Sequence, residues 1–155
     1  MRQPHHIAFI SAEDTHPVRF KVLWPHKSGP EKCIIDNDYD TGARHIGAFN
    51  ADSELTGVCS LFDQRSERNP QVLPLNDRVY RLRVMGTIPE VRGEGSGAQI
   101  IEFASQWCQA QGVKWLWCDA REVAFGFYQK MHFEFFSEAY EVPEIGMHRM
   151  MARKL

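Results

Sequence analysis

Short runs of apolar residues, several of them alternating with polar ones, predict the strands of this chain. Between positions 79 and 85, Tyr80, Leu82 and Val84 would point to one side of a strand, and arginines take two positions on the other side. Further strands are expected at residues 6–10, 45–49, 55–62, 113–118, 133–142 and 147–154. Turn-forming residues at 50–53 and 143–146 separate neighbouring strands, so hairpins are expected there.

Apolar residues spaced three and four positions apart predict helices between these strands. The clearest stripe runs from Ile100 to Cys108, follows a glycine-rich run, and ends at Gly112. A second helix is expected at residues 13–24, capped by Ser11 or Thr15. A third is expected at residues 122–131, with these side chains facing inward: Val123, Ala124, Phe127 and Met131. Hairpins mixed with helical crossovers predict an α/β or α+β fold, in which helices flank a central sheet.

Length, charge and cysteine content narrow the class of protein. The 155 residues are enough for one domain, expected to cover residues 1–155. A net charge of −2 without a basic stripe argues against nucleic-acid binding, and no apolar run reaches membrane-spanning length. The first six residues lack the apolar stretch of a signal peptide. The four cysteines form no CxxC pair, so we expect buried, reduced thiols, a cytoplasmic location and no metal site.

The run from Arg92 to Gly97 lies between a predicted strand and a predicted helix. The start of a helix has unpaired backbone N–H groups and the positive end of the helix dipole, which attract anions. Glycines allow a ligand to approach the backbone closely, and Arg92 adds a fixed charge with forked donors. The run therefore predicts a pyrophosphate cradle, completed by Gly93, Glu94, Gly95, Ser96 and Gly97.

Other phosphate-binding loops fit this run less well. A nucleoside-triphosphate loop is excluded because its lysine is missing. A dinucleotide fingerprint does match at Gly93, Gly95 and Ala98, and Asp119 at the end of the next strand would then bind a ribose. That fingerprint needs a tight turn, whereas residues 87–92 separate the strand end from the first glycine. An NAD-binding domain is therefore the less favoured alternative.

A wider stretch, residues 85–97, resembles the acetyl-CoA motif of the GNAT superfamily of N-acetyltransferases. That motif is a strand, a proline and (Arg/Gln)-x-x-Gly-x-(Gly/Ala) before a helix, and Arg92, Gly95 and Gly97 fall on its marked positions. A second block, from Asp119 to Phe133, resembles the family's Asn-Ala-Arg, Ala, Phe-Tyr-x-Lys-x-Gly-Phe segment. The resemblance implies the GNAT acyl-CoA N-acyltransferase fold, a mixed, mostly antiparallel sheet flanked by helices. It also implies acetyl-CoA as cosubstrate and a primary amine of a small molecule or peptide as acceptor.

The resemblance assigns cofactor-binding roles to individual positions. The strand that ends in Met85, Gly86 and Thr87 would splay from the next strand and pair with the pantetheine arm, and Gly86 suits a bulge there. Asp119, Phe127 and Tyr128 complete the expected cofactor contacts. Two positions depart from the family pattern. Asp119 replaces a common Asn, and His132 replaces a Gly but can still adopt the left-handed cap conformation.

Tyr128 is the predicted general acid. A phenol with a pKa near 10 stays protonated at pH 7 and can donate its proton to the leaving thiolate. The general base stays open among His148, Glu138, His45 and Glu54. A non-catalytic acyl-CoA sensor on the same fold is the alternative from another functional class. Pairing of a closing strand's exposed edge across a two-fold axis would make a homodimer.

Overall fold

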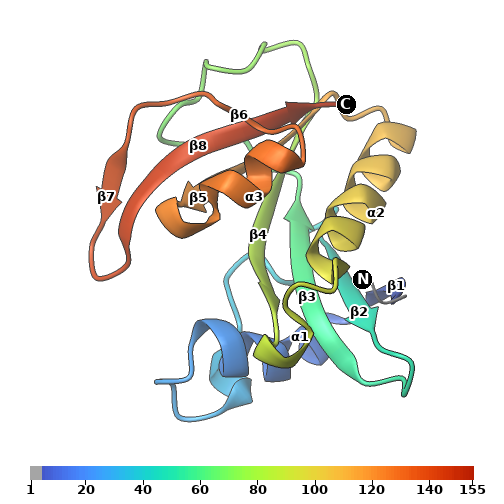
Figure 1. Ribbon diagram of the computed structural model, residues 1–155. Coiled ribbons are helices and arrows are strands. Elements are labelled where there is room, and N and C mark those ends of the chain that lie inside the picture. Colours follow the sequence, from blue (N-terminus) through green and yellow to red (C-terminus); the bar gives the residue numbers. More distant parts are fainter. Residues whose placement is uncertain (1–4) are drawn as a thin grey trace. The chain divides into compact units, whose positions relative to one another are not determined.

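The computed structural model describes residues 5–155 (Figure 1). Residues 1–4, part of the segment in which we expect no signal peptide, lie outside this range. The described chain forms two compact units. Unit 1 comprises residues 5–62 and 82–104, and unit 2 comprises residues 63–81 and 105–155. Strand β4 (Val79–Thr87) and helix α2 (Ser96–Ala110) each begin in one unit and end in the other.

The strands of unit 1 form an antiparallel meander. Strand β1 (His6–Ile10) pairs with β2 (Arg44–Phe49), and β2 pairs with β3 (Leu55–Phe62), whose other neighbour is β4. The structure confirms the strands predicted from the apolar runs in this half, and β3 matches its predicted range, residues 55–62. All but the first residue of β3 are buried, which explains why its sequence is continuously apolar or small.

The first helical segment differs from the single helix predicted at residues 13–24. Helix α1 (Ala12–Val18) begins at Ser11, whose side chain accepts the backbone N–H of Asp14 in a capping box. A π-helical turn, η1 (Arg19–Leu23), follows and closes with the amide of Trp24 on the carbonyl of Arg19 at 3.0 Å. Pro17 has no amide to continue the regular ladder, and the wider turn follows directly after it.

The segment between η1 and β2 is fixed by a buried ion pair. Arg19 is fully buried, and its guanidinium donates to both carboxylate oxygens of Asp38 at 2.8 Å. It also donates to Ser60 Oγ at 3.0 Å and to the carbonyl of Cys33 at 2.9 Å. A 3₁₀ turn, η2 (Pro30–Lys32), lies within this loop. The acidic run at 36–40 is therefore not a freely solvated stretch, because its central carboxylate neutralises Arg19.

His45 belongs to the same buried cluster. Its Nδ1 lies 2.7 Å from Ser60 Oγ and its Nε2 lies 2.9 Å from the carbonyl of Asp38. Because a carbonyl oxygen only accepts, Nε2 carries the proton of the neutral ring and Nδ1 accepts from the Ser60 hydroxyl. Burial lowers the pKa of His45, which favours this neutral form.

We expect the stability of the protein to fall as the pH drops below about 6.5. The folded pKa of His45 lies below its unfolded value, so the unfolded chain binds the proton first, and this loss continues until the folded pKa is reached. Burial raises the pKa of Asp38, but Arg19 and the hydrogen bond from the amide of Ile35 together hold that pKa below its usual range. Asp38 therefore adds a second loss below about pH 4. Urea unfolding between about pH 2 and pH 8 measures both losses, and His45→Gln should flatten the profile in its upper part, below about pH 6.5. Parallel profiles for the two proteins would contradict this assignment.

Unit 2 is built around the antiparallel pair of β5 (Trp115–Arg121) and β8 (Gly146–Lys154). Their register runs from Trp115 opposite Lys154 to Arg121 opposite His148. Two short strands, β6 (Glu134–Phe135) and β7 (Tyr140–Val142), pair with the other edge of β8. The expected single strand at 133–142 is thus wrong. The pairing with β8 is interrupted between β6 and β7, because the amide of Met150 donates its hydrogen bond to the hydroxyl of Ser137 at 2.8 Å and not to a strand carbonyl. Since β8 has neighbours on both edges, the exposed edge expected for a homodimer is left only to β6 and β7.

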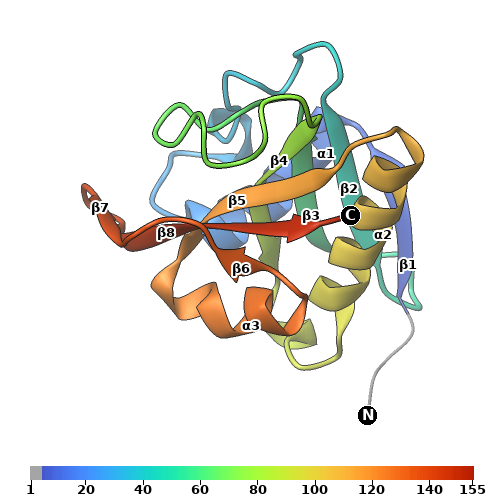
Figure 2. The same ribbon diagram turned by 90° about the horizontal axis from the view of Figure 1, so that it is seen from above.

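The third helical segment is also shorter than predicted. A 3₁₀ turn, η4 (Glu122–Ala124), leads into α3 (Phe125–Lys130), which lies alongside β5 and β8 in Figures 1 and 2. The expected inward position of Val123 is wrong, since its side chain is 90% exposed, whereas Tyr128 is buried. His132, two residues after the end of α3, has a φ of 69°, which confirms the predicted left-handed conformation. None of the described helices combines the length and apolar character that a bilayer span requires.

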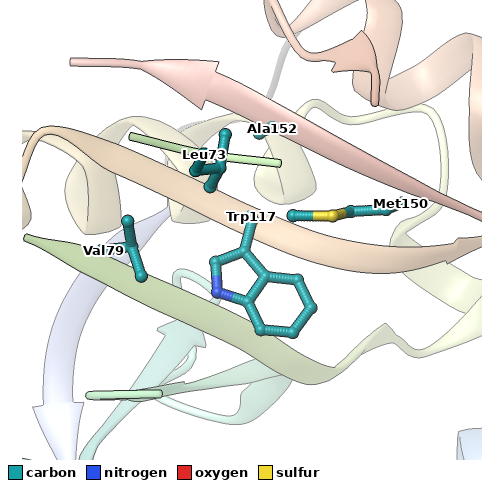
Figure 3. Close-up of a cluster of buried hydrophobic side chains, with 5 residues drawn as sticks. All are labelled: Leu73, Val79, Trp117, Met150 and Ala152. Carbon is teal, nitrogen blue, oxygen red and sulfur yellow. The ribbon is translucent and has the colours of Figure 1, made fainter. Parts of the chain in front are cut away.

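A compact apolar cluster holds unit 2 together (Figure 3). Trp117 packs there with residues from a loop and from two strands, and its indole N–H donates to the carbonyl of Gln64 at 2.8 Å. The other members are Leu73, Val79, Met150 and Ala152. Strands β4 and β5 run parallel here, with Val79, Tyr80 and Arg81 opposite Trp115, Leu116 and Trp117. Because its N–H has a hydrogen-bond partner, the indole ring can be buried in this cluster without an unsatisfied polar group.

Candidate active site

The glycine-rich loop of unit 1 leads from a 3₁₀ turn, η3 (Pro89–Val91), into helix α2. Gly93 and Gly95 adopt φ values of +87° and +89°, a region that strains any residue with a Cβ. The amides of Arg92 and Glu94 donate to the carbonyls of Pro89 and Val91. No backbone acceptor is found within residues 5–155 for four other amides, those of Gly93, Gly95, Ser96 and Gly97. The loop therefore offers a set of free donors at the N-terminus of a 15-residue helix.

The charges around this loop are unevenly distributed. The Arg92 side chain is exposed and makes no hydrogen bond or ion pair with residues 5–155, although its charge helps to lower the pKa of Glu90. Glu94 Oε1 lies 3.3 Å from Nε2 of His5, so a protonated His5 would compensate this acidic side chain. A Cβ placed on Gly93 would meet no atom within 4 Å, so the space beside the loop backbone is open. The free donors, the open backbone and the free cation fit a pyrophosphate group.

The end of β4, which the resemblance assigns to the pantetheine arm, has an irregular backbone. The departure from extended backbone is at Val84, with a φ of 49°. A bulge at Gly86 stays a prediction. A left-handed β-branched residue within a strand is uncommon and interrupts its regular pleat. Gly86 allows close packing, because a Cβ there would lie 3.0 Å from Cγ1 of Val22. Met85 and Thr87 are half-buried on either side.

Tyr128 lies in unit 2, with its ring buried between aromatic neighbours. Its ring centroid is 5.2 Å from those of Phe127 and Phe133. The hydroxyl hydrogen-bonds to the thiol of Cys118 on β5. Burial raises the pKa of Cys118 strongly, and the Tyr128 hydrogen bond lowers it by less. Cys118 is therefore a neutral thiol next to the phenol.

The other three cysteines are also free and buried, as the sequence predicts. Burial raises the pKa of Cys33, and it raises the pKa of Cys108 to about 12. These thiols are poor nucleophiles, because thiolates are the reactive form. Residues 5–155 bring no three metal-binding side chains together.

His148 on β8 has one nitrogen available for proton transfer. Its Nδ1 lies 2.9 Å from the carbonyl of Gly146, so Nδ1 carries the proton of the neutral ring and Nε2 keeps its lone pair. The imidazole is 7% exposed and stacks on the ring of Tyr140, with centroids 6.1 Å apart. The geometry of His148 thus suits a base better than that of His45, whose two nitrogens are both occupied. Glu138 and Glu54 are exposed.

Asp119 forms a polar cluster of its own within unit 2. Arg81 donates to one carboxylate oxygen at 2.9 Å, and the hydroxyl of Tyr140 donates to the other. Burial and this carboxylate raise the pKa of Tyr140, so its phenol stays protonated. Arg68 lies over the Tyr140 ring, with its guanidinium carbon 4.0 Å from the centroid. The negative charge of Asp119 is therefore compensated inside the protein.

Sequence reasoning did not find two of these contacts. The bond between Cys118 and Tyr128 joins residues from β5 and α3, and the bond between Tyr140 and Asp119 depends on how β7 and β5 pair with β8. In the structure Arg81 lies opposite Trp117, which places it near Asp119 two residues further along β5.

Comparisons with known proteins agree with this geometry. Residues 9–133 match the model of the Acetyltransferase (GNAT) family. An uncharacterized N-acetyltransferase of Bacillus subtilis, YitI, is 34% identical over 148 residues, which are 94% of this chain and 93% of that protein. Among solved structures, Escherichia coli ElaA has a TM-score of 0.72 at 20% identity, with 97% of this chain and 99% of that chain covered.

An acyl-CoA N-acyltransferase from Pseudomonas aeruginosa has a TM-score of 0.70 at 18% identity, with 97% of this chain and 99% of that chain covered. These structural neighbours confirm the predicted fold, a mixed eight-stranded sheet flanked by helices. The family model covers most of the chain, and it includes both the glycine-rich loop and the Tyr128 block. This chain belongs to the GNAT family of acetyltransferases.

Proposed function

We propose that this protein transfers an acetyl group from acetyl-CoA to a primary amine of a small molecule or peptide. The observation that carries the proposal is the loop before α2, where four free amides and an unpaired arginine surround an open stretch of backbone. These groups would hold the pyrophosphate of the cosubstrate. Backbone groups of Met85, Gly86 and Thr87 would bind the pantetheine arm. We also propose that residues 1–155 act as one domain in the cytoplasm, supported by the four free thiols.

The chain's own residues would then divide the proton transfers of the reaction. Bound acetyl-CoA supplies a thioester, whose carbonyl carbon accepts the amine nitrogen while the carbon–sulfur bond breaks. Nε2 of His148 would take a proton from the amine, because its lone pair is not used within unit 2. The phenol of Tyr128 would give its proton to the departing thiolate. The products are an amide and the free coenzyme A thiol.

Ligand-dependent thermal stability tests the cosubstrate directly. A ligand that binds only the native state raises the melting temperature, so millimolar acetyl-CoA should give a clear shift and NAD should give none. A shift with NAD and none with acetyl-CoA would support the dinucleotide-binding alternative instead. A panel of primary amines, assayed by release of free coenzyme A, then measures turnover.

Arg92→Ala is expected to weaken acetyl-CoA binding by about tenfold or more, because it removes a charge-assisted contact to phosphate. Isothermal titration measures this change. Arg44→Ala is the matched control, since it removes the same charge from another exposed position. Arg44 belongs to β2, and its guanidinium donates to the carbonyl of Ala43. Equal affinities for Arg92→Ala and the wild type would remove Arg92 from the binding site.

A further inference from the structure

A small open pocket lies at one end of the sheet in unit 2. It is formed where β5 ends, where η4 begins, and where the turn between β7 and β8 enters β8. Its volume is about 200 Å³, and its lining residues are Arg121, Glu122, Val123, Ile145 and Met147. This volume is below the roughly 300–1,000 Å³ of sites for drug-sized ligands, so the pocket suits a compact molecule.

The pocket carries two opposite charges that nothing in the described chain uses. Arg121 and Glu122 are consecutive and exposed, and neither side chain has a hydrogen bond or ion pair with residues 5–155. They also do not pair with each other. Two unpaired, opposite charges beside one cavity are complementary to a ligand that carries a carboxylate and an ammonium group.

The rest of the lining is apolar, although it faces solvent. Val123 is 90% exposed, Ile145 is 52% exposed and Met147 is 40% exposed. The turn that presents the last two is held by the amide of Ile145 on the carbonyl of Val142 at 3.0 Å. Left-handed residues on either side of Ile145, Glu144 and Gly146, fix its direction. A group of exposed apolar side chains rimmed by charges marks a binding surface, and this one would cover a ligand's apolar part.

We propose that this pocket binds an apolar α-amino acid. Arg121 would hold its carboxylate, Glu122 would face its ammonium group, and Val123, Ile145 and Met147 would pack against its side chain. The inference rests on the proposed function in one respect: it names such an amino acid as the amine acceptor. The register of the sheet supports that role, since Arg121 lies opposite His148, the proposed base.

Leucine is the probe for a binding test by isothermal titration without acetyl-CoA, so that binding is measured independently of catalysis. Leucine should bind the wild type, and three analogues should bind at least about tenfold more weakly, because each lacks one recognised group. These are 3-methylbutylamine without the carboxylate, 4-methylpentanoate without the ammonium group, and glycine without the apolar side chain. Wild-type affinity for leucine equal to that for glycine would overturn the proposal.

Single substitutions assign each charge. Arg121→Gln should weaken leucine binding about tenfold and leave 3-methylbutylamine unaffected, and Glu122→Gln should weaken leucine and leave 4-methylpentanoate unaffected. Lys130→Gln, a charge change at an exposed position of α3, is the control. Unchanged leucine affinity in Arg121→Gln would contradict the assignment. A second result would also contradict the proposal. If the protein is a dimer, and Val123→Asp dissociates it but still binds leucine normally, then the exposed apolar residues form an interface between copies of the chain.

The pocket and the proposed reaction can fail separately. Leucine binding that follows this pattern, in a protein that acetyl-CoA does not stabilise, would support the pocket and refute the acetyltransferase proposal. A protein that binds acetyl-CoA and acetylates other amines, but does not bind leucine, would refute the pocket alone.

Discussion

Replacing Arg19 by methionine should destabilise the protein by about 3–5 kcal/mol. The guanidinium is fully buried and donates to both oxygens of Asp38, to Ser60 and to the carbonyl of Cys33. Removing it leaves an uncompensated carboxylate inside unit 1, which costs far more than the charge pair contributes when intact. Urea unfolding at pH 7, followed by circular dichroism, measures the change.

Two further variants make this test specific. Lys21→Met is the matched control, because Lys21 lies two residues further along the same turn. Lys21 pairs with Glu90 on the surface at 3.1 Å, so the loss of stability should be much smaller. The double variant Arg19→Met, Asp38→Leu should recover much of the lost stability, since no charge stays buried alone. A double variant no more stable than Arg19→Met alone would mean that the lost packing, and not the unpaired charge, sets the cost.

Tyr128→Phe is expected to lower kcat by about 10²–10⁴-fold while leaving acetyl-CoA affinity unchanged. Phenylalanine keeps the ring contacts with Phe127 and Phe133 and removes only the hydroxyl, so the fold should be retained. The loss would fall on the step in which the thiolate leaves, because the departing sulfur then has no proton donor. Steady-state kinetics with an accepted amine and titration with acetyl-CoA measure the two quantities separately.

Matched variants separate catalysis from packing at this position. Tyr39→Phe removes another phenol hydroxyl, one that donates to Glu13 on the surface, and should leave kcat unchanged. Cys118→Ala keeps the Tyr128 phenol and removes only the thiol that hydrogen-bonds to it, so it should cost less than Tyr128→Phe. An unchanged rate in Tyr128→Phe would exclude Tyr128 as the general acid. A wild-type protein that binds acetyl-CoA but acetylates no amine would instead support the sensor alternative.

The local elements of this fold were predictable because each is specified by a short stretch of sequence. The apolar pattern predicted β3 and the body of α2, and Ser11 was one of the two caps predicted for the first helix. The glycine-rich loop was predictable for the same reason, since backbone conformation at Gly93 and Gly95 depends on those residues themselves. The left-handed cap at His132 also followed from its position at a helix end.

The tertiary structure decided what depends on residues far apart in the chain. Arg19 meets Asp38 and Ser60 only after α1, the loop and β3 have packed, so the local sequence does not show that Asp38 is part of a buried ion pair. Tyr128 meets Cys118 only through the packing of α3 on β5, and Val123, predicted to lie inside, is exposed because the chain begins η4 as a 3₁₀ turn. Periodicity specifies which face of a segment is apolar. Register and packing specify which partner that face meets, and this second choice is made by the whole chain.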